Sequence, residues 1–561
     1  MSLHPEAIPF IPEETARVAR AAFPKGNLYM QMRDELGTFY KDEDFAHLYP
    51  RRGQSAAAPW RLALITILQF VENLSDRQAA EAVRARIDWK YALSMELTDT
   101  GFDYSVLSEF RHRLLAGKSE HYLLDAMVRC FTERKLIKDR GKQRTDSTHV
   151  LAVVRDLTRV EHIGETLRHA LNELAIVAPE WLVQHVPQTW YDRYGKRFEE
   201  SRLPRLIAER ETLTTAIGTD GFQLLDRIYQ PDTPSLVQLS TAVELLRQVW
   251  LQQFYAPNEK VQLREAKDSP PGALRIRSVY DMEARHSIKR STEWTGYKVH
   301  LTETCDSESP RLITNTETTE ATTQDQSVVK NIHKALKRKG MLPKQHIVDQ
   351  GYMSAHLIAT SQQEYEVELL GPVAMDVRWQ AKAGEGFSLS DFQVNWKRKT
   401  VRCPRGKRSH LWKPGQDSFG NPIIHVEFRK PDCAKCPVRS QCTRSVTQPR
   451  GITLKAQEDY EALRMARTRQ QTDSFKQEYA IRSGVEGSLS QGIRAFHLRS
   501  CRYIGLAKAR LQHIMTAAAL NVVRAVAWLE GIPLAKTRQS HFARLNPSLP
   551  DLQSEPVTTP A

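Results

Sequence analysis

The sequence predicts an α/β protein with a mixed sheet flanked by helices, preceded by an all-α N-terminal domain and interrupted by two insertions. Three observations lead to this prediction. Apolar residues recur at helical spacing through the first 140 residues, whereas β-branched runs begin only after Lys142. Helical spacing returns over residues 157–262 before strand patterns resume. A region rich in Lys, Arg, Trp and Cys then separates the last strand pattern from two long helical patterns.

The composition limits the possible classes of protein. A length of 561 residues suggests roughly three or four domains. The formal net charge of +14 favours a polyanionic partner, although many basic proteins bind no nucleic acid. The N-terminus lacks the pattern of a signal peptide, and the apolar stretch Ile514–Leu529 is interrupted by Asn521 and Arg524. We therefore expect a cytoplasmic protein with no membrane segment, whose seven cysteines are reduced or bind metal.

The changes in pattern set the expected segment boundaries. These segments are an all-α N-terminal domain (1–140), the first part of the core (141–156), a helical insertion (157–262), the continued core (263–376), a small basic Cys-rich insertion (377–455), the C-terminal helices of the core (456–530) and a disordered tail (531–561).

Short helices are expected in the N-terminal domain. Apolar spacing predicts a helix over residues 60–73, and Ser75 with Gln78 has the form of a capping box that begins the next helix. A further helix begins at Ser105 and is expected to turn Arg111 and Arg113 outward. Such helices suit either a helix-turn-helix-like DNA reader or a packing domain with solvated arginines.

Strands and helices alternate through the continued core. Strands are expected at 276–280, 297–303, 312–316, 346–349 and 367–370, and helices at 324–336, 354–363, 458–482 and 502–529.

Two aspartates occupy strand settings. Asp146 lies in Arg-Thr-Asp-Ser-Thr and runs into the apolar stretch 150–154, so its strand is expected to be central. A carboxylate in such a strand is costly unless a charge or metal neutralises it, although Ser147 and Thr148 also allow a simple strand-start cap. Asp349 ends the strand 346–349, where α/β sheets place ligand-binding groups. A turn aspartate before glycine is also common.

A helical array accompanies these aspartates. Tyr479, Arg482 and Glu486 are spaced by three and four residues and share one helical face. Arg482 suits bidentate phosphate binding and Glu486 suits a metal, while a solvated salt bridge between the two is the alternative. Two strand aspartates and a helical glutamate together suit a two-metal phosphoryl-transfer site.

These motifs resemble the DDE transposases of bacterial insertion sequences, in the branch with the Y-x2-R-x3-E signature, an RNase H-like core and an InsH-like N-terminal domain. The resemblance spans residues 40–530. It also includes Trp294-x-Gly296-Tyr297-Lys298-x-His300, Asp281-Met-Glu283-Ala-Arg285 and Ala517-Ala518-x-Leu520-Asn521-x2-Arg524. One departure is visible: the family often has Lys seven residues after the glutamate, where this chain has Ile493, so Arg494 is carried only as a DNA-contact candidate.

The resemblance implies a function. Asp146, Asp349 and Glu486 would hold two Mg²⁺ or Mn²⁺ ions. DNA contacts are expected from Tyr479, Arg482 and Arg494, and from Arg111 and Arg113 if the N-terminal helices read DNA. The enzyme would hydrolyse phosphodiesters at the terminal inverted repeats of the element and join the ends to target DNA, as a homodimer in the bacterial nucleoid. A nuclease that cuts without joining and a catalytically silent DNA-binding regulator are the alternatives.

Four cysteines in the basic insertion suggest a second metal. They follow the pattern C-x29-C-x2-C-x5-C, formed by Cys403, Cys433, Cys436 and Cys442. Four thiolates suit a structural Zn²⁺ site, although a zinc ribbon would have two tight pairs and free thiols are the alternative. Nearby basic residues with Trp396 and Trp412 suit a DNA backbone, while core packing is the simpler explanation for these tryptophans.

Overall fold

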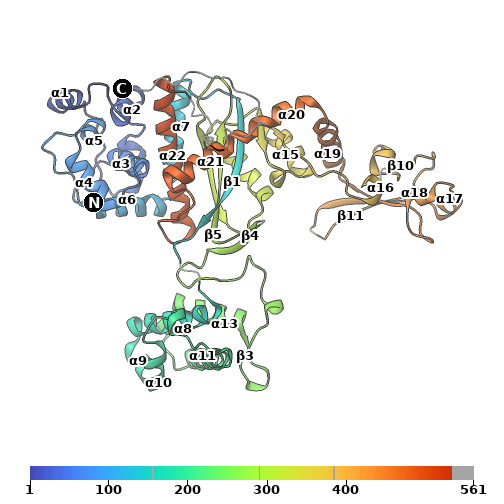
Figure 1. The fold of residues 1–561 in the computed structure, drawn as a ribbon, viewed down its shortest axis with the longest axis horizontal. Coiled ribbons are helices and arrows are strands. Elements are labelled where there is room, and N and C mark those ends of the chain that lie inside the picture. The colour runs from blue at the N-terminus through green and yellow to red at the C-terminus, as the bar shows by residue number, and fades with distance from the viewer. Residues whose placement is uncertain (155–156, 290, 383–385, 419, 534–541, 543–561) are drawn as a thin grey trace.

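A computed structural model shows a central α/β core with the N-terminal helices packed on one side of it (Figure 1). The helical insertion and the Cys-rich region protrude from this core. The structure describes residues 1–154, 157–289, 291–382, 386–418, 420–533 and 542. The predicted tail 531–561 lies outside the described residues, apart from 531–533 and 542, and so do residues 155–156 at the end of the first part of the core and 383–385 within the expected Cys-rich insertion. Among the described residues, no helix has the length and apolarity that crossing a bilayer requires.

The core is a six-stranded mixed sheet. Its strand order is β4-β5-β1-β7-β8, and β6 also pairs with β5. The pairs among β4, β5, β6 and β1 are antiparallel, whereas β1–β7 and β7–β8 are parallel. The strands are β1 (Lys142–Leu151), β4 (Arg285–Lys289), β5 (Thr292–Thr304), β6 (Ile313–Glu320), β7 (Gln345–Val348) and β8 (Glu368–Leu370).

The register of β1 sets the position of the two aspartates. β1 lies between β5 and β7, which confirms that its strand is central. Thr145 pairs with Val348 in the parallel ladder, so Asp146 is level with Asp349, the residue that follows β7. On the other side Asp146 is opposite Leu301 of β5. The parallel pairing therefore brings together two carboxylates that are 203 positions apart in the sequence.

Helices cover both faces of the sheet and complete the core. They are α14 (Val329–Arg338), α15 (Ala355–Tyr365), α19 (Gln457–Gln470), α20 (Asp473–Ala480), α21 (Gly484–Phe496) and α22 (Leu506–Leu529). α21 contacts β1, and α22 contacts β6 and α21. The predicted helix 502–529 is thus largely confirmed, whereas the predicted single helix 458–482 is wrong, because the chain breaks between α19 and α20.

The N-terminal helices share one apolar core with the sheet and α22. They are α1 (Glu13–Ala22), α2 (Leu28–Leu36), α3 (Pro59–Val71), α4 (Asp76–Ala85), α5 (Ile87–Ala92), α6 (Ser105–Ala116) and α7 (Tyr122–Glu133). The cluster runs from Met32 and Leu64 to Leu301 of β5 and Leu520 of α22. The predicted capping box is confirmed, since Ser75 accepts from the Gln78 amide and the Gln78 side chain accepts in return.

Arg111 does not point outward as predicted. Its side chain is 8% exposed and forms a two-point ion pair with Asp76 at the start of α4, and its guanidinium lies over the ring of Tyr503. Arg113 is 21% exposed and contacts Glu109. The expectation of an outward side chain was wrong for Arg111, because helical spacing gives no information on a carboxylate supplied by another helix, whereas Arg113 is partly buried against the ring of Tyr49.

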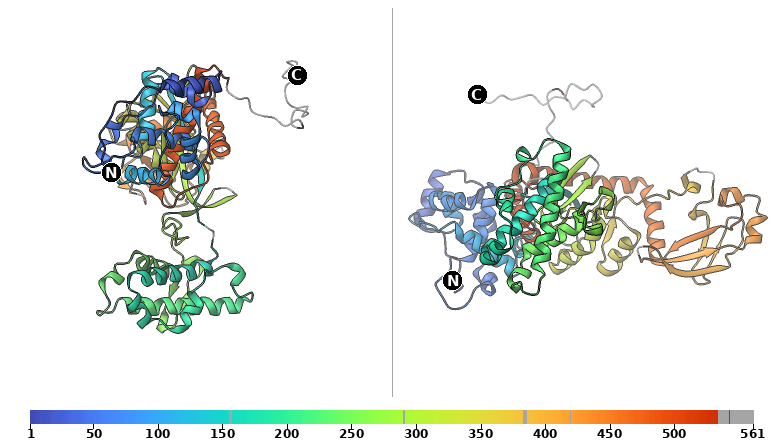
Figure 2. Two further views of the ribbon diagram at one scale, coloured as in Figure 1. Left: turned by 90° about the vertical axis from the view of Figure 1, so that its left-hand side faces the viewer. Right: turned by 90° about the horizontal axis from the view of Figure 1, so that it is seen from below.

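The helical insertion has a core of its own. Its elements are α8 (Arg159–Val177), α9 (Pro179–His185), α10 (Gln188–Tyr194), α11 (Ile207–Ile228), α12 (Ser235–Gln238), α13 (Thr241–Gln253), β2 (Phe254–Tyr255) and β3 (Gln262–Leu263). Ile163, Ile217 and Trp250 lie in its separate apolar cluster. Figure 2 shows this helical part standing away from the sheet. The strand predicted at 276–280 is absent, although Ile276 and Val279 pack onto this cluster.

The Cys-rich region forms the second protruding part (Figure 1). Its elements are α16 (Trp379–Lys382), β9 (Gln393–Asn395), β10 (Thr400–Arg402), β11 (Leu411–Gln416), β12 (Pro422–Glu427), α17 (Lys430–Ala434), α18 (Arg439–Cys442) and β13 (Gly451–Lys455). Trp396 and Trp412 meet edge to face, with ring centroids 5.4 Å apart, against the local apolar cluster. This contact favours core packing over base stacking for both tryptophans.

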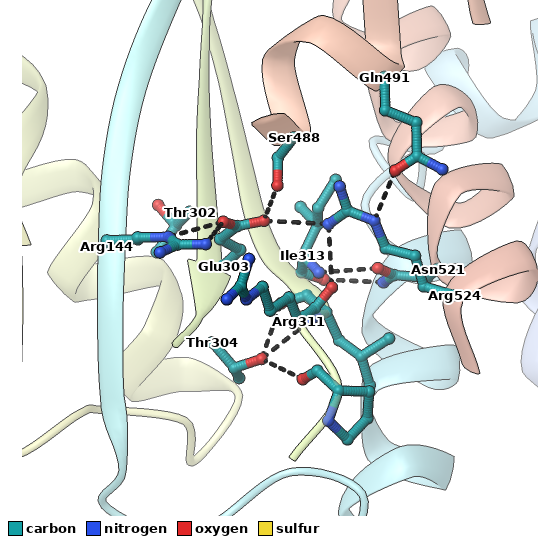
Figure 3. Close-up of polar contacts among 12 residues, drawn as sticks. Arg144, Thr302, Glu303, Thr304, Arg311, Ile313, Ser488, Gln491, Asn521 and Arg524 are labelled. Atoms are coloured by element: carbon teal, nitrogen blue, oxygen red, sulfur yellow. Dashed lines mark hydrogen bonds and ion pairs between the residues drawn. The ribbon is translucent and has the colours of Figure 1, made fainter. Parts of the chain in front are cut away.

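One buried ionic network ties the sheet to the C-terminal helices (Figure 3). Glu303 of β5 is fully buried and pairs with Arg144 of β1 at 2.6 Å and with Arg524 of α22 at 3.0 Å. Ser488 of α21 donates its hydroxyl proton to the same carboxylate. Asn521 of α22 exchanges two hydrogen bonds with the backbone of Ile313 on β6. These contacts fix α21 and α22 relative to β1.

Replacement of Glu303 by Leu should destabilise the protein strongly. The change leaves Arg144 and Arg524 buried without their shared carboxylate, and breaking a buried pair in this way costs about 3–5 kcal/mol. Calorimetry should show a lower midpoint for the transition of the core. As a control, Glu14→Gln, which breaks an exposed pair with Arg17, should leave the midpoint nearly unchanged. Equal midpoints for both variants would contradict the structural role of the network.

Candidate active site

Three carboxylates from separate elements meet at one end of the sheet. Asp146 projects from β1, Asp349 follows β7, and Glu486 lies in the first turn of α21. Their side chains are 14%, 47% and 69% exposed respectively. Solvent exposure therefore increases across the site, from the largely buried Asp146 on the central strand to the exposed Glu486 on the helix.

Arg482 lies between these carboxylates. One guanidinium nitrogen, Nη2, is 2.6 Å from Asp146 Oδ2 and 3.9 Å from Asp349 Oδ2, and Nη1 is 3.6 Å from Glu486 Oε1. The Arg482 side chain is only 15% exposed, and its Nε has no hydrogen-bond partner within the protein. The Arg482 cation thus offsets part of a concentration of negative charge that would otherwise be unfavourable in a half-buried setting.

The Tyr479-Arg482-Glu486 array does not lie on one regular helix. α20 ends at Ala480, residues Ile481–Ser483 form a 3₁₀ turn, and α21 then begins at Gly484. The backbone dihedral angles of Ile481, Ser483 and Gly484 remain right-handed, so the three side chains still converge. Arg144 donates to the Ile481 carbonyl and leaves no space for a Cβ at Gly484. The buried network therefore shapes the turn that carries Arg482.

Tyr479 lies beside Asp349. Its hydroxyl is 3.5 Å from Asp349 Oδ1, and its ring stacks on Phe475 with an interplanar angle of 9°. Burial, partly offset by Arg482, raises the pKa of the Tyr479 phenol to about 12. The phenol is therefore protonated near neutral pH and can donate to a carboxylate or a phosphate oxygen.

Burial and neighbouring charges shift the pKa of Asp146. Burial raises its pKa above the ordinary 3.8, while Arg482 and the Ser147 amide, which donates to Oδ1 at 2.8 Å, oppose the rise. Negative charge on Asp349 raises it further. A carboxyl group whose ionised form is disfavoured by burial gains most from a nearby cation.

The carboxylates are suited to divalent cations by chemistry, since Mg²⁺ and Mn²⁺ prefer oxygen ligands. In the described part of the chain, however, no three His, Cys, Asp or Glu side chains are grouped closely enough to hold a metal ion. At the carboxylates the guanidinium of Arg482 takes the central position instead. Binding of a cation there requires this side chain to move.

The remaining residues of the expected site are dispersed. Arg494 is exposed in the last turn of α21, whereas Ile493 packs against the main apolar core. The position at which the family often has Lys is thus turned inward in this chain. Arg111 and Arg113 lie in α6 and are not part of the carboxylate cluster.

Two lysines near the 349–352 turn escaped the sequence-based site assignment. Lys289 at the end of β4 is 57% exposed and close enough to lower the pKa of Asp146. Lys298 of β5 is 12% exposed and pairs with Asp325. Both line a cavity of about 420 Å³ together with Gln350 and Trp294. Lys298 and Trp294 belong to a motif noted in the sequence, but the motif alone gives no direction for these side chains.

A basic chain with three carboxylates around one arginine at the end of a mixed sheet is consistent with an enzyme that acts on nucleic acids. Residues 402–526 match the family model described as "Transposase DDE domain", and residues 17–113 match "Transposase domain (DUF772)". No curated protein matches the chain. The chain is a DDE-type transposase, an enzyme that cuts and transfers DNA, and such enzymes generally use divalent metal ions.

The pH dependence of stability should change in an Asp146→Asn variant. Because the folded-state pKa of Asp146 is raised, the folded protein holds this proton more tightly than the unfolded chain. Ionisation of Asp146 therefore lowers the free energy of unfolding as pH rises from about 3.8 through the raised value. The melting temperature of the variant minus that of the wild type should be more positive at pH 7 than at pH 4.

The control variant is Asp473→Asn, which removes an exposed carboxylate from the first turn of α20 together with its surface ion pair to Lys476 and reports the effect of losing charge at the surface. If the melting temperature of Asp146→Asn minus that of the wild type is equal at both pH values, or is more positive at pH 4, the raised pKa of Asp146 is contradicted.

Proposed function

We propose that this transposase hydrolyses phosphodiesters at the ends of an insertion sequence and joins the freed 3′-hydroxyls to target DNA, with Asp146, Asp349 and Glu486 as catalytic residues. The convergence of all three carboxylates on Arg482 is the observation that carries the proposal. We also propose that the core is RNase H-like. The order β6-β5-β1-β7-β8, antiparallel in the first three strands and parallel afterwards, supports this assignment.

Two divalent cations, Mg²⁺ or Mn²⁺, would be held by these carboxylates and would supply activation of the attacking oxygen and neutralisation of charge on the phosphate. The side chains have separate tasks. Asp146 anchors the site, because the central strand and its burial restrict its movement. Glu486 is exposed and free to adjust. Tyr479 can donate a hydrogen bond to a phosphate oxygen.

Arg482 is proposed to contact the DNA backbone once cations hold the carboxylates. Its planar guanidinium suits bidentate phosphate binding, and its Nε is already without a protein partner. The exposed Arg494 on α21 is proposed to extend this contact. Arg113 remains a weaker candidate, and Arg111 is committed to Asp76.

The proposed partners are the terminal inverted repeats of the element and a target duplex in the bacterial nucleoid. Each chain carries one carboxylate cluster, whereas an element has two ends to cut and join. A homodimer that holds both ends would supply one cluster for each end.

Removal of any one carboxylate should abolish both DNA reactions. Wild-type protein, incubated with DNA carrying the element ends, Mg²⁺ and a target plasmid, should give cleaved and joined products. Asp146→Asn, Asp349→Asn and Glu486→Gln should each reduce both by more than about 100-fold, since each loses a cation ligand. Gel analysis of radiolabelled ends gives the rates, and Asp473→Asn should retain activity.

The three possible outcomes separate the alternatives. Cleavage without joined product would indicate a nuclease, and DNA binding without cleavage would indicate a silent regulator. Full activity in any of the three carboxylate variants would remove that residue from the site.

We further propose that Cys403, Cys433, Cys436 and Cys442 bind a structural Zn²⁺ ion. All four line one small, apolar cavity of about 30 Å³. Cys403 is placed by a turn in which Gly406, with φ of +80°, donates its amide to the Cys403 carbonyl. The others lie on and around α17 and α18. The donor set fits zinc by its chemistry, although the thiols have to close around the ion.

Zinc binding at these cysteines should release protons. Burial raises the pKa of the Cys442 thiol to about 11, so it is protonated near neutral pH and must ionise to bind metal. Titration of metal-free protein with Zn²⁺ in weak buffer should acidify the solution until one Zn²⁺ ion has been added per chain. Cys433→Ser should lose this metal, whereas Cys130→Ser should keep it. Purified protein without stoichiometric metal and with no proton release would exclude the site.

A further inference from the structure

The turn that carries Asp349 is held at two points by neighbouring residues of β5. It consists of Asp349 followed by the 3₁₀ turn Gln350–Tyr352, closed by a hydrogen bond from the Tyr352 amide to the Asp349 carbonyl. The Asp349 side chain is 47% exposed. Its contacts with the Tyr479 hydroxyl and with Arg482 are long, at 3.5 Å and 3.9 Å. Its direction therefore depends on the backbone of this turn.

The first point is a buried hydrogen bond at the end of the turn. The Tyr352 hydroxyl is 2.7 Å from His300 Nδ1, and both side chains are at most 1% exposed. The rings meet at 85°, with centroids 5.7 Å apart. His300 lies opposite Ser147 of β1, the residue after Asp146. The contact therefore links the Asp349 turn to the sheet beside Asp146.

The second point is an ion pair that packs against the middle of the turn. Lys298, two residues before His300 on the same face of β5, pairs with Asp325 at 3.0 Å and donates to the Thr323 carbonyl. Asp325 in turn lies against Gly351, where an added Cβ would be 3.1 Å from its Oδ2. Both members of the pair are less than 15% exposed.

We propose that His300 and Lys298 are positioning residues which hold the 349–352 turn at Tyr352 and Gly351 and so aim the Asp349 carboxylate toward Asp146. Side chains two residues apart in a strand lie on the same face, so Lys298 and His300 of β5 both face the 349–352 turn. This inference rests on the proposed role of Asp349 as a cation ligand. Groups that orient a metal ligand typically change metal affinity or activity by about 10–100-fold when lost.

The decisive variant is Tyr352→Phe, which keeps the buried ring and removes the hydroxyl. We expect it to keep the wild-type melting temperature to within a few degrees and to bind Mn²⁺ at least about 10-fold more weakly. Electron paramagnetic resonance of free Mn²⁺, titrated against full-length protein without DNA, measures this affinity. Tyr365→Phe, which removes a hydroxyl from α15 outside the site, should bind Mn²⁺ as the wild type does.

Substitutions at His300 provide a second test. His300→Asn places an amide near the position of Nδ1 and should keep most of the wild-type affinity for Mn²⁺. His300→Leu offers no hydrogen-bonding group and should bind Mn²⁺ more weakly. If His300 only stabilised the fold, both variants would have lower melting temperatures and would bind Mn²⁺ with equal affinity. Lys298→Met should weaken Mn²⁺ binding in the same direction as Tyr352→Phe.

The outcomes separate this inference from the proposed function. If Asp349→Asn weakens Mn²⁺ binding but Tyr352→Phe and His300→Leu do not, the positioning role is overturned and the catalytic assignment stands. If neither the wild type nor any variant binds Mn²⁺, both proposals fall.

Discussion

The pairing of one buried glutamate with two arginines supports the geometry of the whole site. Glu303 is fully buried, and its partners Arg144 and Arg524 come from the first strand of the core and from its last helix. An ion pair in such a place gains little net free energy, because desolvation offsets attraction. Its effect is on geometry. The contacts of Glu303 with Arg524 and Ser488 hold α22 and α21 against β1, and in this arrangement Arg482 and Glu486 lie beside Asp146.

The same network explains why the Tyr479-Arg482-Glu486 array does not need a regular helix. Arg144 reaches past Glu303 to the Ile481 carbonyl and fills the space beside Gly484. The 3₁₀ turn at 481–483 is therefore a consequence of side-chain packing from β1, two residues before Asp146 on the same strand. One strand thus carries a carboxylate of the site and also sets the turn that brings the arginine to it.

Local patterns predicted the elements well and the long-range contacts poorly. The central strand β1, the strand before Asp349 and the capping box at Ser75 each depend on neighbouring residues, and all are present. Arg111 was expected outward because its partner, Asp76, lies 35 residues away. The break near Ile481 depends on Arg144, which is 337 residues distant. Three carboxylates were recognised from their motifs, but the central placement of Arg482 and the support from His300 required the fold.

The continuity of the main apolar core has a consequence for synthesis of the chain. α3 and α7 bury apolar side chains against α22, which is translated almost 400 residues after α7. At ribosomal rates of about 5–20 residues per second, these early helices wait roughly 20–80 s for the helix that covers them. Throughout that interval the nascent chain exposes apolar side chains that α22 covers in the finished fold, and such exposed apolar surface favours aggregation.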